Sequence, residues 1–284
     1  MASGDRELPR AVNGLGEMRL AAIRVYPVKS LAGVDVRDAE VQPWGLRHDR
    51  RWLLLEADGT VLTAREEHTM LGIAATPLAG GGIDLSCDGS TLRVEPPLEG
   101  ELLPTTLSRL ESVRSAGREA DEWLSRMLRR PVRLGWLDDP RRRTVSAAHG
   151  GRAGDYLNLS DAGPLLLTSE RSLEQLNAWI AEAQAPMVMT RFRPNVVAAG
   201  SEEPFAEDTW THVDIGEVRF RVGERCDRCV LTTIDPDNLD AGKEPLRTLA
   251  RHRRWDHKTW FGIRLIPTRT GTIRAGDSVA VAGR

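Results

Sequence analysis

Residues 223–236 read GERCDRCVLTTIDP and place two of the chain's three cysteines, Cys226 and Cys229, three positions apart. The preceding segment, HVDIGEVRFRVG (212–223), alternates apolar and polar residues, and the segment after Cys229 is rich in β-branched residues. Both patterns are typical of β-strands. A Cys-x-x-Cys pair in such a place can be half of a zinc site, a redox dithiol, or the source of one thiolate for another metal.

The first two interpretations find little support in the rest of the sequence. A structural zinc site needs four ligands, and His252 with His257 is a poor substitute for a second cysteine pair. A redox dithiol normally begins a helix, whereas the strand-like VLTTIDP follows Cys229. Arg225 and Arg228 favour an ionised sulfur, which is a strong metal ligand. One thiolate cannot hold a metal alone, so a cofactor that brings its own sulfurs, such as the molybdopterin dithiolene, would fit.

Length and composition indicate a soluble globular protein. The chain has 284 residues, 40% of them apolar, which is enough for two ordinary domains. A formal charge of -2 gives no electrostatic argument for nucleic acid or an anionic membrane. No run approaches the roughly 18 to 20 apolar residues of a membrane span, and the N-terminus lacks the apolar core of a secretory signal. We therefore expect a cytoplasmic protein in which residues 1–17 form a flexible leader.

The first half of the chain predicts a β-rich domain over residues 18–137. Its short strands are followed by a helix over 119–130. Residues 138–154 are charged, glycine-rich and aperiodic, which indicates a mobile linker loop. Within this linker, the run Arg141–Arg143 is either a solvated face or a docking patch for an acidic partner.

The second half, residues 155–284, predicts an α+β domain. It contains a helix that Ser172 can cap and a second helix over 245–254, between several short strands. Many short strands need their edges hidden. We therefore expect a closed or nearly closed antiparallel sheet.

Four motifs carry a resemblance to a known family: YPVKS (26–30), LRHDRRW (46–52), RFRPN (191–195) and CDRCVLTTIDPDN (226–238), followed by KEPLRTL. In this order and spacing the chain resembles, over nearly all its length, the MOSC proteins that carry an associated N-terminal β-barrel domain, a group that includes the mitochondrial amidoxime-reducing component. The resemblance implies an α+β, β-rich fold, with a β-barrel-like domain over 18–137 and a MOSC β-barrel domain with peripheral helices over 155–284. It also implies a molybdenum cofactor whose metal is bound by Cys229.

The residues of these motifs suit such a cofactor, which ends in a phosphate and has a pterin edge rich in donors and acceptors. Arg50 and Arg193 offer cationic forks from opposite halves of the chain, although an arginine next to Trp52 could simply stack on that ring. Asn195 can both donate and accept. The other candidate cofactor-binding residues are Lys29 and Ser30 in a turn after a strand, Thr168 and Ser169 before a helix, and Asp227 and Arg228 beside the cysteine ligand.

Two further residues of the cysteine motif are candidates with an open role. Asp235 could orient groups or relay protons in the pocket, or merely form a turn before Pro236. Cys226 could be a spectator, a second redox thiol or a reserve ligand.

The resemblance implies an oxidoreductase that reduces small N-hydroxylated compounds by oxygen transfer to molybdenum. An external electron-transfer protein is expected, because the chain stops at Arg284 without the clustered cysteines of a ferredoxin domain. Loop 141–152 is a candidate for meeting this partner. Two alternatives remain: a sulfur-carrier or cofactor-handling protein that uses Cys229, and a pyridoxal-phosphate binder with Lys29 as the Schiff-base residue.

Overall fold

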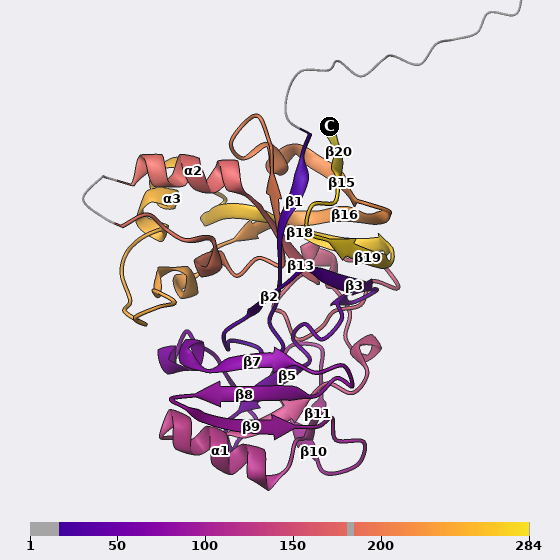
Figure 1. The fold of residues 1–284 in the computed structure, drawn as a ribbon, viewed down its shortest axis with the longest axis vertical. Helices are drawn as coiled ribbons and strands as arrows, with labels where there is room; N and C mark the ends of the chain where they lie inside the picture. The colour runs from indigo at the N-terminus through magenta and orange to yellow at the C-terminus, as the bar shows by residue number, and fades with distance from the viewer. Residues whose placement is uncertain (1–16, 181–184, 284) are drawn as a thin grey trace, which may run out of the picture.

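The computed structural model describes residues 17–180 and 185–283. They form two lobes stacked along the long axis of the molecule (Figure 1). The expected leader, residues 1–17, lies outside the described residues except for Glu17. The fold is α+β and β-rich, as the sequence predicts. Among the described residues, no helix is both long and apolar enough to cross a membrane.

The upper lobe is built on a nine-stranded sheet in the order β2-β1-β14-β13-β18-β16-β15-β20, with β17 paired to β18. A separate three-stranded sheet has the order β19-β3-β4. The strands are β1 (Arg19–Val25), β2 (Val34–Val36), β3 (Asp38–Gln42), β4 (Gly45–Leu46), β13 (Leu165–Ser169), β14 (Val196–Ala199), β15 (Trp210–Ile215), β16 (Val218–Asp227), β17 (Arg254–Trp255), β18 (Lys258–Arg269), β19 (Gly271–Arg274) and β20 (Val279–Gly283).

The large sheet nearly closes on itself, as the sequence predicts. The main-chain N–H of Leu20 donates to Asp277 O, and that of Val279 donates to Met18 O, both at 2.8 Å. These bonds join β1 to the chain around the start of β20 and hide strand edges. The expectation of a wholly antiparallel sheet is wrong, because β13 and β14 pair in parallel. Helix α2 (Glu170–Trp179) carries the chain back between them, as parallel pairing requires.

The lower lobe contains a five-stranded sheet in the order β10-β11-β12-β5-β6 and a three-stranded sheet in the order β7-β8-β9. Helix α1 (Arg118–Leu128), within two residues of the predicted helix, buries Trp123 and Leu124 in the same apolar cluster as Trp52. The strands are β5 (Trp52–Leu55), β6 (Val61–Leu62), β7 (Ala74–Pro77), β8 (Ile83–Cys87), β9 (Ser90–Val94), β10 (Leu102–Pro104), β11 (Ser112–Ser115) and β12 (Arg133–Trp136).

The two lobes do not follow the linear order of the chain. Strands β1 to β4 fall in the first half of the sequence, yet β1 pairs with β14 and β3 pairs with β19 in the upper lobe (Figure 1). The chain passes to the lower lobe only afterwards, at β5. The motifs YPVKS (26–30) and LRHDRRW (46–52) therefore lie where the chain runs between lobes, and a bridge from Val28 to Trp52 joins them.

The segment 138–154 is more ordered in its contacts than a mobile linker. It contains η2 (Pro140–Arg142) and η3 (Ala147–His149). Arg143 is fully buried and donates to three main-chain carbonyls, among them Asn158 O at 2.5 Å. Arg141 and Arg142 pair with aspartates of the same segment. For Arg143 the expectation of a solvated or partner-binding cation is wrong, because its charge is used inside the fold.

The helical part of the upper lobe also corrects one expectation. Ser172 does not cap α2, which begins at Glu170 after the N-cap residue Ser169. The Ser172 hydroxyl instead lies 2.8 and 2.9 Å from the two carboxyl oxygens of Glu207, and it accepts a bond from Phe205 N. The other short helices are η1 (His68–Gly72), η4 (Met189–Phe192), η5 (Ala206–Thr209), η6 (Val230–Thr233) and α3 (Leu246–His252). The last of these confirms the helix predicted over 245–254.

Glu207 gives the fold a predictable pH dependence. Burial raises the pKa of its carboxyl to about 7. The folded protein therefore holds this proton where the unfolded chain has lost it, so the free energy of unfolding should fall by about 3 kcal/mol between pH 4.5 and 7. We expect Glu207→Gln to flatten this slope and to exceed the wild type in stability above pH 7, as measured by urea unfolding. The exposed Glu203→Gln is the matched control, and an unchanged slope in Glu207→Gln would contradict the assignment.

Candidate active site between the lobes

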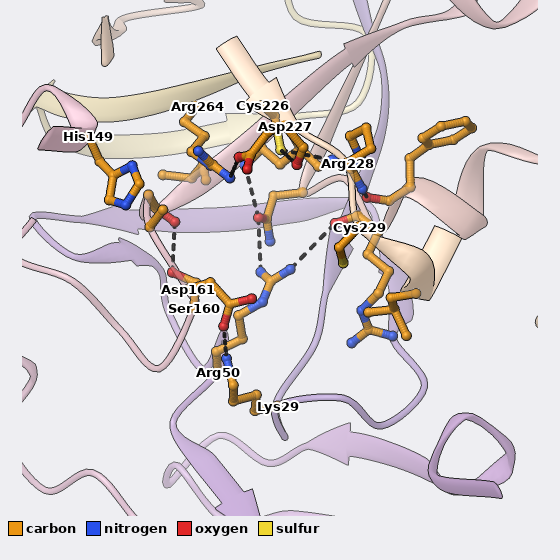
Figure 2. A pocket seen from close by; sticks show the side chains of 18 of the residues that line it. Lys29, Arg50, His149, Ser160, Asp161, Cys226, Asp227, Arg228, Cys229 and Arg264 are labelled. Atoms are coloured by element: carbon orange, nitrogen blue, oxygen red, sulfur yellow. Dashed lines mark hydrogen bonds and ion pairs between the residues drawn. The ribbon is translucent and has the colours of Figure 1, made fainter. Parts of the chain in front are cut away.

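A cavity of about 340 Å³ lies where segments of both halves of the chain meet. Its lining includes nine of the twelve candidate residues that the sequence singles out: Lys29, Ser30, Arg50, Arg193, Asn195, Cys226, Asp227, Arg228 and Cys229 (Figure 2). The YPVKS and LRHDRRW motifs supply the first three of these. The segment before β14 and the end of β16 supply the others.

Three predicted residues lie outside this cavity. Thr168 and Ser169 are fully buried on the central strand β13, and the Thr168 hydroxyl lies 3.2 Å from the sulfur of Met189. Asp235 forms an ion pair with Arg191 and accepts a bond from the main-chain N–H two residues later at 2.9 Å. The second contact fits the turn-forming role that the sequence left open for Asp235. Asp235 lines a different cavity.

The two cysteines of the motif are placed differently. Cys229 is exposed; it follows the end of β16 and is the N-cap residue of η6. The Nε of Arg65 lies 3.4 Å from its sulfur. Cys226 is only 6% exposed, and Arg228 Nη1 lies 2.9 Å from its sulfur. The sulfur of Cys229 is therefore the more accessible of the two, and it has an arginine from the lower lobe beside it.

The structure gives no support to the zinc interpretation. Among residues 17–180 and 185–283, no group of three or more His, Cys, Asp or Glu side chains could hold a metal ion by itself. A metal at Cys229 would need most of its ligands from elsewhere.

Asp161 links the lower and upper parts of the cavity wall. Its carboxylate forms one ion pair with Lys29 (Figure 2) and another with Arg65. Burial alone would raise the pKa of Asp161, but these two cations outweigh it and hold the pKa well below its usual range. Lys29 also donates to Leu159 O at 3.0 Å, and burial lowers the pKa of its amine. The Lys29 amine is thus already engaged by an aspartate, which argues against a Schiff-base role.

Arg50 and Arg193 lie together across the boundary between the chain's two halves. Arg50 Nη1 donates to Asp49 at 2.5 Å and to Asn195 Oδ1 at 3.0 Å. The guanidinium groups of Arg50 and Arg193 lie 4.7 and 4.3 Å, respectively, from the centre of the Tyr26 ring. Burial lowers the pKa of Arg193 to about 10. Its Nη2 is buried without a hydrogen-bond partner among the described residues, so this arginine has a donor free for a ligand.

Several lining residues escape sequence reasoning. Arg65 and Asp161 belong to no motif, and they meet only because the fold brings distant turns together. His149 falls in the segment interpreted as a linker, yet its Nδ1 lies 2.6 Å from Glu224 Oε1. Arg264 pairs with Glu224 and, at 2.7 Å, with Asp227. No spacing or periodicity in the sequence marks these contacts.

Comparison with known proteins agrees with the motifs. The MOSC domain family matches residues 154–280, and the family of the MOSC N-terminal beta barrel domain matches residues 17–131. The chain is 34% identical to mitochondrial amidoxime-reducing component 1 of Homo sapiens over 93% of its own length and 83% of that protein. It is 33% identical to the Mus musculus protein of the same name, over 93% and 82%.

A second kind of relative covers the chain equally well. Identity to the molybdenum cofactor sulfurase of Solanum lycopersicum is 31% over 98% of this chain, but over only 38% of that longer protein. Both alignments cover more than nine tenths of this chain. The chain thus belongs to the MOSC domain proteins that carry an N-terminal MOSC β-barrel domain, and it is similar to the mitochondrial amidoxime-reducing components.

Proposed function

We propose that this chain binds a molybdenum cofactor in the cavity between the lobes, with the sulfur of Cys229 as the protein ligand of the metal, and reduces N-hydroxylated compounds. The observation that carries the proposal is an exposed thiol, with Arg65 3.4 Å from its sulfur, in a cavity lined by cations from both halves of the chain. The names and the similarity of the relatives support the same activity class.

The residues present fit such a cofactor. The lining has two carboxylates, Asp161 and Asp227, against six cations: Lys29, Arg50, Arg65, Arg193, Arg228 and Arg264. This excess of positive charge suits a ligand that carries a phosphate. The volume of about 340 Å³ is in the range of small-molecule sites. Arg193 Nη2 and Arg228 Nε are buried without partners among the described residues, so both have donors left for a ligand.

The contacts assign different tasks to the candidate residues. Asn195 already accepts from Arg50 and from Leu166 N, and it donates to Arg24 O. Its amide oxygen and one of its two N–H groups are therefore engaged, and we infer that its main task is to orient Arg50. Arg193 is free to bind the cofactor directly.

When bound, the cofactor supplies a two-electron centre that can take up the oxygen of an N–O bond. The chain's own part is to hold that centre and to move protons. Arg65 places a cation beside the Cys229 sulfur, with its Nε 3.4 Å from that atom. Asp161, whose pKa is held low by its two cations, stays ionised and cannot donate a proton. His149 lines the cavity, and its Nδ1 contacts Glu224. An imidazole can both donate and accept a proton, so we assign to His149 the proton relay that the sequence suggested for Asp235.

The proposed function is tested on protein purified from a molybdenum-replete host. We expect near-stoichiometric molybdenum, pterin fluorescence after oxidation, and reduction of an aromatic amidoxime with a chemically reduced viologen as electron source. Protein from a molybdenum-starved host is the control. Bound cofactor without turnover of any N-hydroxylated compound would instead favour a cofactor-handling protein, the second candidate, which the similarity to the sulfurase supports. Absence of molybdenum and pterin would contradict both.

A further inference from the structure

A second cavity, of about 170 Å³, adjoins the first through the shared residues Arg193 and Leu231. Its other charged lining residues are Arg24, Arg191 and Asp237, and the remaining lining includes Tyr26 and several apolar side chains. The lining itself holds three cations and one carboxylate, although Arg24 and Arg191 also form ion pairs with Asp35 and Asp235 outside it. The cavity is therefore an electropositive environment of a size that suits a small ligand or part of a larger one.

Four buried donors in this lining have no hydrogen-bond partner among the described residues: Nε of Arg24, Oη of Tyr26, Nε of Arg191 and Nη2 of Arg193. In the part of the chain that the structure describes, ten side-chain nitrogen or oxygen atoms share this state. Four of them thus belong to one small cavity. Because a buried donor without a partner is destabilising, their concentration here points to a ligand with several acceptor atoms.

The remaining contacts of the arginines narrow the kind of acceptor. Arg24 donates its terminal nitrogens to Asp35 at 2.8 Å and to Gly33 O at 2.7 Å. The terminal nitrogens of Arg191 donate to Asp235 and to the main-chain carbonyl of Thr233. In each of these two arginines the Nε–H is left without a partner in the described part of the chain. A carboxylate is best bound by two parallel donors of one guanidinium, whereas single donors from several residues suit a phosphate group with three or more acceptor oxygens.

Tyr26 and Arg193 complete the set. Tyr26 is 1% exposed, and burial raises the pKa of its phenol, so the hydroxyl keeps its proton and can donate. The guanidinium of Arg193 lies 4.3 Å from the centre of the Tyr26 ring. Among the described residues Arg193 forms no ion pair. The side chain of Arg193 is half-buried, and an anion in the cavity would supply the counter-charge that it lacks.

We propose that this cavity is a binding site for a phosphate-type oxyanion, held by Arg24, Tyr26, Arg191 and Arg193. Two sources share this chemistry: the phosphate of a cofactor in the adjoining cavity, and a separate phosphate or phosphate monoester. The site does not depend on which metal, if any, binds at Cys229.

The test is calorimetric titration of the cofactor-free full chain with inorganic phosphate, in the wild type and three variants. Tyr26→Phe should weaken phosphate binding about tenfold, and Arg24→Gln and Arg191→Gln about tenfold to a hundredfold, because each removes one donor to the anion. Without phosphate, Tyr26→Phe should melt at the same temperature as the wild type or higher, since it removes an unpaired buried hydroxyl. Weaker phosphate binding together with an unchanged or higher melting temperature would show that the Tyr26 hydroxyl contacts the ligand and does not stabilise the fold.

The control is Arg133→Gln, an arginine of a different cavity in the lower lobe, which should leave phosphate binding within about twofold of the wild type. Titration of the cofactor-loaded protein distinguishes the sources. Phosphate binding that persists there identifies a separate phosphate compound as the ligand, and binding confined to the cofactor-free chain identifies the cofactor's own phosphate. No phosphate binding by the wild type, or equal affinity in all variants, would overturn the site.

Discussion

Cys229→Ala is expected to abolish molybdenum retention, whereas Cys226→Ala is expected to keep it. The sulfur of Cys229 is exposed and has Arg65 beside it, while Cys226, which also lines the cavity, is only 6% exposed. Loss of a residue that only supports a ligand costs about 10- to 100-fold in metal affinity, so loss of the ligand itself should cost at least about 100-fold. Molybdenum per chain, measured by mass spectrometry after gel filtration, reports the result.

The two variants control for each other, because they remove the same thiol from the same motif. Cys226→Ala takes a contact away from Arg228, so a small loss of stability is expected there rather than a loss of metal. Circular dichroism establishes that both variants are folded. Loss of molybdenum in Cys226→Ala with retention in Cys229→Ala would reverse the ligand assignment.

Only the lining residues that belong to a sequence motif could be predicted from the sequence. Lys29, Arg50 and Arg193 line one cavity, and each belongs to a short motif that the sequence singles out. Thr168 and Ser169 are different. They sit on a strand with neighbours on both sides, and whether such a side chain faces the cavity or the interior depends on pairing partners far away in the chain.

The same reason limits the prediction of the fold. Short strands and both long helices follow from local patterns, and the structure confirms them. Strand β1, however, pairs with β14, so Ile23 lies opposite Val196 across more than half of the sequence. Nothing in the alternation of β1 distinguishes a partner in its own half from a partner in the other. The interleaving of the lobes, and with it the meeting of Arg65 with Asp161, is a property of tertiary pairing alone.

Asp49→Ala is expected to lower the free energy of unfolding by about 3–5 kcal/mol. The carboxylate of Asp49 is fully buried and accepts from three donors: Tyr26 N at 2.8 Å, Arg50 Nη1 at 2.5 Å and Asn158 Nδ2 at 3.1 Å. Removing it leaves a buried main-chain N–H, an amide and a cation without their shared acceptor. Chemical unfolding followed by tryptophan fluorescence gives the measurement.

The matched control is Asp35→Ala, which removes an aspartate from an ion pair with Arg24. The Asp35 side chain is 72% exposed, so solvent already screens the pair and the expected loss is about 0–1 kcal/mol. Asp49→Asn should fall between the two, because it keeps an oxygen for Tyr26 N but turns a donor toward Arg50 or Asn158. Equal losses of unfolding free energy in Asp49→Ala and Asp35→Ala would mean that burial does not determine how much the Asp49 carboxylate contributes to stability. The order of the three losses bears on the cavity, because the buried Asp49 carboxylate holds Arg50 in place. Arg50 in turn donates to Asn195 in the other half of the chain, so Asp49 helps to orient a cation at the boundary between the two halves.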